Sequence, residues 1–139
     1  MLVLDTNVIS ELMRPKPDPS VVAWVGAQPG GSLFTTTVTE AELRYGLALL
    51  SAGTRRKRLI EAFDRMMAED FAQRILSFDR HAARAYAEIV AGRRQSGRPI
   101  AQFDAQIAAI ARSRDASVVT RNERDFSDCG IEVTNPWPH

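Results

Sequence analysis

The stretch Met1-Leu2-Val3-Leu4-Asp5-Thr6-Asn7 decides how this chain is expected to fold. Three apolar residues lead into an aspartate, which is followed by two residues that favour turns and helix caps. A short apolar run bounded by such residues is typical of a buried parallel strand. Because open α/β sheets bind ligands beyond the carboxyl ends of their strands, Asp5 is expected at a functional position. The alternative is that Asp5 only caps the following helix.

Strand-like and helix-like segments alternate along the rest of the chain. We expect further strands at residues 32–36, 74–78, 117–120 and 132–134, and helices at 7–13, 20–28, 38–51, 55–69, 80–95 and 100–114. Helix starts are indicated at Asp18, Thr54 and Asp79, and by a capping-box pattern at residues 37–40. The alternation predicts an α/β fold in which helices cover a parallel sheet of four to five strands.

Composition favours an ordinary globular protein. The 139 residues are 45% apolar and 25% charged, which suits one domain spanning residues 1–139. A net charge of +1 excludes a globally polybasic chain, so contacts to nucleic acid would need a local patch. The single Cys129 excludes an internal disulfide and a multi-cysteine zinc site. With no apolar run of transmembrane length and no leader-like segment, we expect a cytoplasmic protein without membrane contact.

Glu42 interrupts the apolar face of its predicted helix. At about 100° per residue it falls between Val38 and Leu49, on an arc that also holds Tyr45. A carboxylate among apolar neighbours is costly unless it is paired or binds a metal. Glu42 is therefore expected to have a functional role.

Asp104 has a similar position on the helix predicted at residues 100–114. It falls on an arc of apolar residues: Ile100, Ile107, Ala108 and Ala111. Two ordinary explanations remain open, namely a favourable interaction with the helix dipole and an ion pair with Arg112.

More polar side chains follow the strand at residues 117–120. Asn122, Glu123 and Asp125 all lie within reach of its carboxyl end, although a solvated turn has the same composition. Carboxylates that converge without histidine or cysteine ligands suit Mg²⁺ or Mn²⁺. Such a site is suited to metal-assisted attack of water on a phosphate ester. Phosphate-binding, dinucleotide-binding and serine-hydrolase loop motifs are all absent from the sequence.

Several segments together resemble the PIN-domain family, and more narrowly the VapC toxins of bacterial toxin–antitoxin pairs in their FitB-like branch. The segments that carry the resemblance are Leu4-Asp5-Thr6-Asn7, Ala41-Glu42-Leu43-Arg44-Tyr45-Gly46, Asp104 at the start of a small-residue helix, Thr120-Arg121-Asn122 and the tail Asn135-Pro136-Trp137. They occur in the expected order over nearly the whole chain. The resemblance implies a single-domain, three-layer α/β/α fold with an acidic pocket.

The resemblance also implies roles for individual residues. Asp5 and Asp104 would be the principal ligands of Mg²⁺ or Mn²⁺, and Glu42 would complete the cluster or orient the attacking water. Thr6 and Thr120 match hydroxyl-bearing positions that line the family pocket, and together with Asn122 they would bind substrate. Asn122 stands where FitB-like relatives often have Asp, whereas Asp125 matches an acid that other relatives place three residues later. Asn122 and Asp125 therefore compete for the fourth pocket position.

The activity implied is that of an endoribonuclease toxin acting on single-stranded RNA or tRNA. Its partners would be a small VapB-like antitoxin and a second copy of the chain, in a homodimer that forms a larger assembly with the antitoxin. Phosphate contacts are expected from arginine and lysine side chains, namely Arg14, Lys16, Arg93, Arg94, Arg98, Arg121 and Arg124. Two alternatives remain: a catalytically impaired PIN domain that binds RNA or acts as a scaffold, and a small metal-dependent phosphatase. Asn7 disfavours the phosphatase, because haloacid dehalogenase-type enzymes have a second Asp there.

Overall fold

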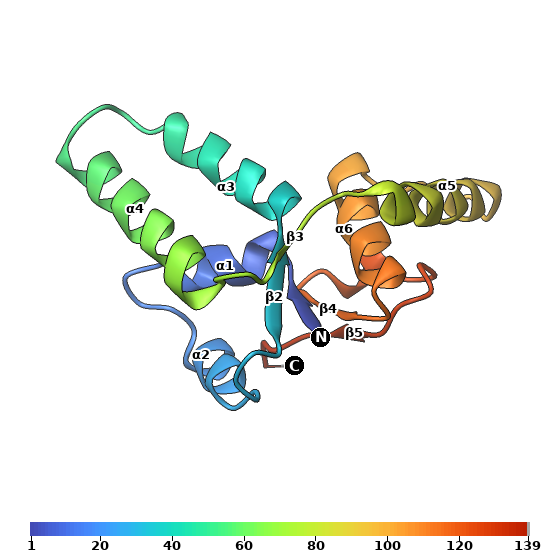
Figure 1. The fold of residues 1–139 in the computed structure, drawn as a ribbon, viewed down its shortest axis with the longest axis horizontal. Coiled ribbons are helices and arrows are strands. Elements are labelled where there is room, and N and C mark those ends of the chain that lie inside the picture. The colour runs from blue at the N-terminus through green and yellow to red at the C-terminus, as the bar shows by residue number, and fades with distance from the viewer. Residues whose placement is uncertain (139) are drawn as a thin grey trace.

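A five-stranded parallel sheet forms the centre of the molecule (Figure 1). The computed structural model describes residues 1–138. In the sheet the strands have the order β3-β2-β1-β4-β5. Their bounds are Leu2–Leu4 for β1, Leu33–Thr36 for β2, Ile75–Leu76 for β3, Ser117–Val119 for β4 and Val133–Thr134 for β5. All four strand pairings are parallel, which confirms the α/β fold expected from the alternating segments.

The direction in which the chain adds strands reverses beside β1. From β1 the chain moves outward through β2 and β3, and it then returns to place β4 on the other side of β1. Val3 is in register with Val118, and Leu4 with Val119. In sheets of this kind the reversal leaves a crevice at the carboxyl ends of the two central strands. Asp5 and Thr120 are the first residues beyond those ends.

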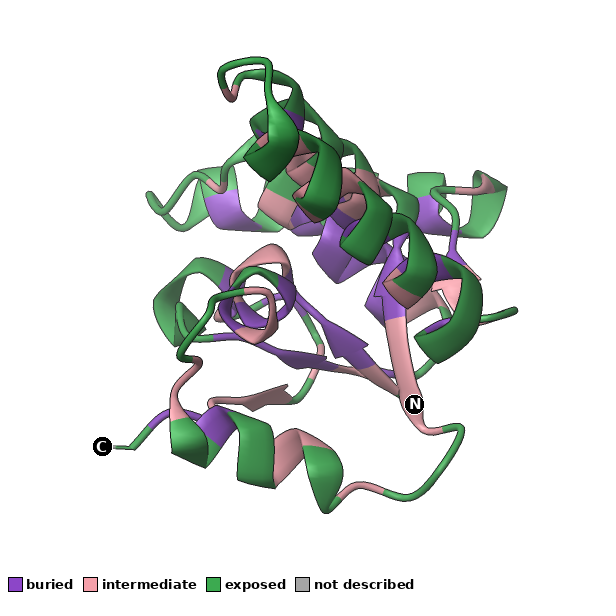
Figure 2. Ribbon diagram, turned by 90° about the vertical axis from the view of Figure 1, so that its left-hand side faces the viewer, coloured by how far each residue is buried: buried purple, intermediate pink, exposed green. Residues whose placement is uncertain are grey.

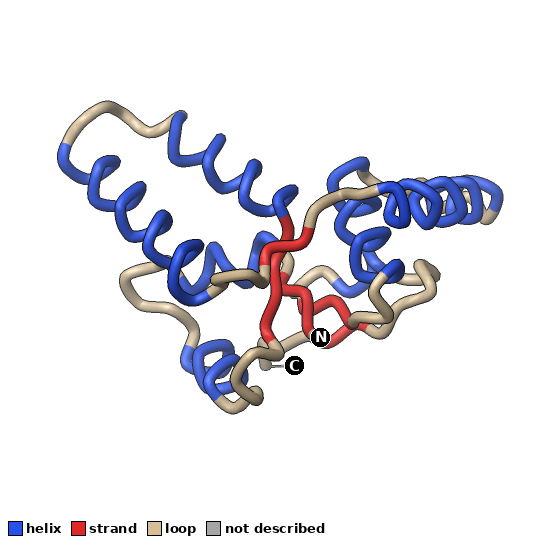
Figure 3. The backbone as a smooth tube through the Cα atoms, in the orientation of Figure 1, coloured by secondary structure: helices blue, strands red, loops and turns tan. Residues whose placement is uncertain are grey.

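Helices surround the sheet (Figure 3). Their bounds are Thr6–Leu12 for α1, Pro19–Gly26 for α2, Thr37–Ala48 for α3, Thr54–Arg65 for α4, Arg80–Gln95 for α5 and Gln102–Ser113 for α6. A short π-helical turn, η1 at Met66–Asp70, extends α4, and a 3₁₀ turn, η2 at Glu123–Phe126, follows β4. Within residues 1–138, none of these helices has both the length and the apolar character that crossing a membrane requires.

Two hydrophobic cores lie on opposite faces of the sheet. Val3 and Val118 face a core built mainly by α5 and α6, whereas Leu4 and Val119 face a core built mainly by α1, α3 and α4. This alternation follows from the two-residue period of a strand. Figure 2 shows the buried strands between helices whose outer surfaces are exposed. The chain is therefore a three-layer α/β/α protein.

Two expected helix caps are wrong by one residue. Thr36, not Thr37, caps α3, because its side chain accepts a hydrogen bond from the Thr39 amide. Glu40 consequently lies beyond the capping-box position, and its carboxylate instead accepts a hydrogen bond from Arg44. Gly53 is the residue before α4, where Thr54 was expected. The caps at Asp18 and Asp79 are confirmed.

Candidate functional site

Asp5 lies buried at the carboxyl end of β1, with 4% of its surface exposed. Its Oδ1 accepts a 2.8 Å hydrogen bond from the Thr6 amide at the start of α1, so Asp5 does cap that helix. Its Oδ2 accepts a second 2.8 Å hydrogen bond, from the Thr120 hydroxyl. Burial raises the pKa of Asp5, and these two hydrogen bonds partly oppose the increase. The carboxylate therefore caps α1 with one oxygen and accepts the Thr120 hydroxyl with the other.

Thr120 is the centre of a small hydrogen-bond network behind Asp5. Besides donating to Asp5, its Oγ1 accepts from Asn7 Nδ2 at 3.2 Å and from the Asn122 amide at 3.1 Å. Asn7 Oδ1 in turn accepts from the Arg121 amide. Thr120 is fully buried and its hydroxyl bonds to Asp5, whereas the resemblance implied that Thr120 binds substrate.

Glu42 is brought to the same region by the first turns of α3. Its Oε1 accepts a 2.9 Å hydrogen bond from the Thr6 hydroxyl, which also contacts the hydroxyl of buried Thr39 at 3.1 Å. Thr6 therefore connects the segment after β1 to Glu42. The expected burial of the whole helix arc is wrong, since Tyr45 and Leu49 are each 68% exposed. The helical period places residues on one face but does not say which face meets the core.

Asp104 lies half-buried in the first turn of α6, among the residues that face the sheet. Burial is the main cause that raises its pKa to about 6, and the carboxylates of Asp5, Asp125 and Glu42 raise it further. Arg93 opposes this increase. The pairing considered for Arg112 is wrong, because that guanidinium binds Glu88 at 2.7 Å. Asp104 thus lies in a field of negative charge.

The segment after β4 brings a fourth carboxylate. Asp125 is exposed on η2, yet its charge raises the pKa of both Asp5 and Asp104. Asn122 is also exposed, and its contact with the site is the hydrogen bond from its backbone amide to Thr120. Between the two competing residues, Asp125 is the one whose charge acts on the other acids.

These four carboxylates (Asp5, Glu42, Asp104 and Asp125) are called the acidic cluster below. In the described part of the chain, residues 1–138, no three acidic, histidine or cysteine side chains are close enough to hold a metal ion as they stand. The chemistry of the donors nevertheless suits a hard divalent cation, because all of them are carboxylate oxygens. Their mutual repulsion, which adds to burial in raising the pKa of Asp104, is also what a bound cation would relieve.

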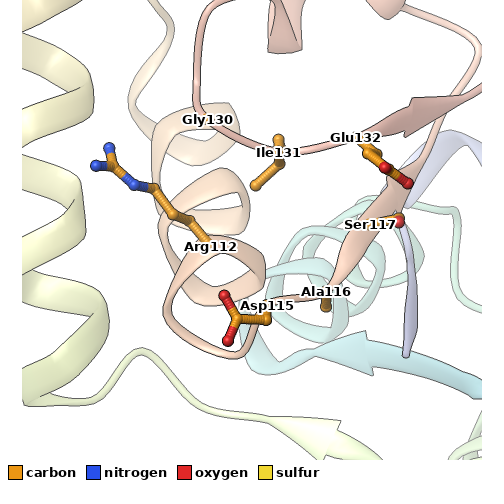
Figure 4. A pocket seen from close by; sticks show the side chains of 7 residues that line it. All are labelled: Arg112, Asp115, Ala116, Ser117, Gly130, Ile131 and Glu132. Carbon is orange, nitrogen blue, oxygen red and sulfur yellow. The ribbon is translucent and has the colours of Figure 1, made fainter.

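Another pocket lies at the opposite ends of the strands. Its volume is about 440 Å³, and its lining consists of Arg112, Asp115, Ala116, Ser117, Gly130, Ile131 and Glu132 (Figure 4). Ser117 begins β4, whereas the acidic cluster lies beyond the end of that strand. The Arg112 side chain extends away from the other lining residues toward α5, where it binds Glu88. None of the four residues of the acidic cluster lines this pocket.

Two positioning residues were not among the site residues expected from sequence. Asn7 connects Asp5 to the segment after β4, and Thr39 supports the hydroxyl of Thr6. Asn7 had been interpreted only as part of the turn. A threonine three residues before Glu42 carries no distinctive sequence signal, since threonine at a helix start is common.

The fold and the acidic cluster define a class of protein, and comparison with known sequences agrees: the chain belongs to the PIN-domain family, whose profile matches residues 2–131. It is 43% identical over 137 residues to the plasmid stability protein StbB of Pseudomonas syringae pv. tomato, with 99% of each chain covered. It is 42% identical over 137 residues to the VapC ribonuclease Y4jK of Sinorhizobium fredii, covering 99% of this chain and 98% of the relative. The structure of FitAB bound to the IR36 DNA fragment is similar with a TM-score of 0.94 and 39% identity, covering 100% of this chain and 97% of that one.

Proposed function

We propose that this protein is a metal-dependent endoribonuclease that acts as the toxin of a toxin–antitoxin pair in the cytoplasm. The observation that carries the proposal is the acidic cluster, in which four carboxylates from separate segments influence one another at the carboxyl ends of β1 and β4. Membership of the PIN-domain family and similarity to a VapC ribonuclease support RNA as the substrate.

Asp5 and Asp104 are the metal ligands in this proposal, with Mg²⁺ or Mn²⁺ as the ion. A divalent ion bound there supplies Lewis acidity toward a phosphate oxygen and makes water a stronger acid. Oδ1 of Asp5 keeps a lone pair available, because among residues 1–138 it accepts only the hydrogen bond from the Thr6 amide, whereas Oδ2 accepts from both Thr120 and Asn7. Those bonds hold the carboxylate in one orientation.

Glu42 is proposed as the general base. Thr6 holds its Oε1, while none of the hydrogen bonds or ion pairs found within residues 1–138 engages its Oε2. Oε2 is therefore the atom proposed to accept the proton of the attacking water. Asp125 completes the negative site, and Asn122 lines its rim without adding charge.

An antitoxin and a second copy of the chain are the proposed partners. Similarity to the FitAB complex over the full length of this chain supports both the toxin role and an assembly with a small antitoxin. An antitoxin would keep the nuclease inactive until it is degraded or diluted. Binding to the antitoxin is expected to suppress cleavage in a one-to-one titration of the two proteins.

The test is cleavage of a single-stranded RNA oligonucleotide and of bulk tRNA by the purified chain. We expect cleavage with Mg²⁺ or Mn²⁺, none with excess chelator, and a loss of at least about 10²-fold in Asp5→Asn. Asp115→Asn is the matched control, because Asp115 is an exposed aspartate in the pocket at the opposite ends of the strands. Undiminished cleavage by Asp5→Asn in chelator would exclude the mechanism.

A further inference from the structure

A second polar pocket adjoins the acidic cluster. It has a volume of about 480 Å³ and is lined by Arg93, Arg98, Arg124, Asp125 and Ser127, which we call the arginine pocket. Asp125 belongs to both places, since it lines this pocket and also raises the pKa of Asp5 and Asp104. The arginine pocket therefore lies directly beside the acidic cluster.

Arg93 is an unusual buried cation in this pocket. Only 6% of its surface is exposed, and it comes from the last turn of α5. Its Nε donates to the Arg98 carbonyl at 2.6 Å, and its Nη1 donates to the carbonyls of Asp125 and Ser127 at 3.1 and 3.0 Å. Among the ion pairs within residues 1–138, none neutralises Arg93.

The remaining nitrogen of Arg93, Nη2, is accessible to solvent. Nη2 has no hydrogen bond to any residue in the described range 1–138, whereas every inaccessible side-chain nitrogen or oxygen in that range has a partner. Solvent must therefore reach Nη2, and Arg93 is one of the pocket's lining residues. A buried guanidinium fixed by three carbonyls presents one pair of N–H donors in a set direction. Such a preorganised donor suits a phosphate oxygen.

Arg124 and Arg98 add positive charge at the rim. Arg98 already binds the carboxylate of Asp128 and the hydroxyl of Ser127. The exposed Arg124 side chain forms no ion pair or hydrogen bond with another residue in the range 1–138, so it can turn toward a ligand. The pocket holds three guanidinium groups against the single carboxylate of Asp125, and the carboxylate of Asp128 lies beside Arg98. Its net charge favours an anion.

We propose that the arginine pocket binds a phosphate of the RNA backbone next to the nucleotide whose bond is cleaved. The proposal rests on the endoribonuclease function proposed above and names a subsite for its substrate. Arg93 Nη2 supplies fixed donors, and Arg124 supplies a mobile charge that closes on the phosphate. The acidic cluster repels RNA, so a neighbouring cationic subsite offsets that repulsion without occupying the metal position.

The test measures binding of a fluorescent single-stranded RNA in Mg²⁺, with every protein carrying Asp5→Asn so that the RNA is not cut. Arg124→Gln should weaken binding about tenfold at low salt and should reduce the slope of log Kd against log salt by about 0.7. Arg124→Lys keeps the charge and should restore most of that slope. Arg84→Gln is the matched control, since Arg84 is an exposed arginine on α5 that does not line the pocket.

Neutral methylphosphonates, introduced one position at a time, show which phosphate the pocket holds. At one position, the methylphosphonate should lower the affinity of the parent protein about tenfold and leave the affinity of Arg124→Gln almost unchanged. Equal losses in both proteins at every position, or an unchanged affinity and salt slope in Arg124→Gln, would overturn the proposal. Inorganic phosphate at millimolar concentration should compete with the RNA in the parent protein and not in Arg124→Gln.

Failure of the pocket and failure of the nuclease function can be told apart. If the wild-type chain cleaves RNA with Mg²⁺ while Arg124→Gln binds RNA normally, the subsite is wrong and the nuclease stands. If the wild-type chain cleaves no RNA, the nuclease function is wrong, whatever the binding data show for the pocket.

Discussion

The hydroxyl of Thr120 donates a 2.8 Å hydrogen bond to Oδ2 of Asp5, joining two side chains that are 115 positions apart in the sequence. The bond crosses the point where β1 and β4 lie side by side. It fixes the orientation of the carboxylate that we propose as the central metal ligand. Thr120 is buried, and its hydroxyl donates one hydrogen bond and accepts two. We therefore expect Thr120 to contribute to function by orienting Asp5.

Replacing Thr120 by valine should therefore lower the affinity for the metal ion more than it lowers the free energy of unfolding. Without the hydroxyl, the Oδ2 atom of Asp5 loses its short hydrogen bond, and the pKa of Asp5 should rise further. We expect affinity for Mn²⁺, measured by calorimetry, to fall about tenfold. Thr35→Val is the matched control, since Thr35 is equally buried but donates to the Leu4 carbonyl. Equal losses of affinity in both variants would contradict the assignment.

Asp104→Asn should stabilise the metal-free protein at neutral pH. The folded-state pKa of Asp104 is about 6, against an ordinary value of 3.8, so the folded state holds its proton more tightly than the unfolded state. The stability that this proton contributes is present below about pH 4 and is lost as the pH rises through 6. Allowing for solvent screening, Asp104→Asn should raise the free energy of unfolding by about 1 kcal/mol at pH 7 and by almost nothing at pH 4.

Chemical denaturation with excess chelator, at both pH values, measures this effect. Asp115→Asn serves as the control because it removes an exposed carboxylate away from the acidic cluster, at φ 52°, where asparagine is tolerated. Saturating Mg²⁺ should reverse the order and make the wild-type chain the more stable of the two, because the ion binds its folded state. Greater stability of the metal-free wild type at pH 7 would contradict the prediction.

The competition between Asn122 and Asp125 can be decided by replacing each one. Because the charge of Asp125 acts on Asp5 and Asp104, Asp125→Asn should weaken Mn²⁺ binding about tenfold. Asn122→Ala should change the affinity by less than about twofold, since the amide that reaches Thr120 belongs to the backbone and remains. Calorimetric titration with Mn²⁺ measures both. The opposite order of effects would assign the fourth pocket position to Asn122.

The side chain of Thr36, which caps α3, should contribute more to stability than the side chain of Thr37. Thr36→Ala removes the side-chain acceptor of the Thr39 amide and should lower the free energy of unfolding by about 1 kcal/mol. The exposed Thr37 lies one residue further on, where the capping box was expected, and Thr37→Ala should be close to neutral. Thermal and urea denaturation of the pair measure the difference. A larger loss of stability in Thr37→Ala would instead support the capping box expected at residues 37–40.

Much of the fold could be predicted from sequence because its signals are local. The apolar runs of β1 and β4, the helix-starting aspartates at residues 18 and 79, and the alternation of strands with helices all depend on neighbouring residues. Caps were less predictable, since adjacent threonines at 36 and 37 offer the same chemistry and only backbone geometry chooses between them. The exposed Tyr45 shows a similar limit, because helical periodicity defines a face without defining its partner.

For the candidate site, the sequence by itself determined where the acids stand relative to strands and helices, and which cations their oxygen atoms suit. Only the tertiary structure decided which groups lie against them: Thr120 behind Asp5, Thr6 against Glu42, and the charge of Asp125 near Asp5 and Asp104. The same holds for Arg93, whose buried guanidinium donates to the nearby Arg98 carbonyl and to the carbonyls of Asp125 and Ser127, which lie more than 30 positions away. The physical reason is that hydrogen bonds and burial depend on distances in space, and parallel-strand topology brings together residues that lie far apart along the chain.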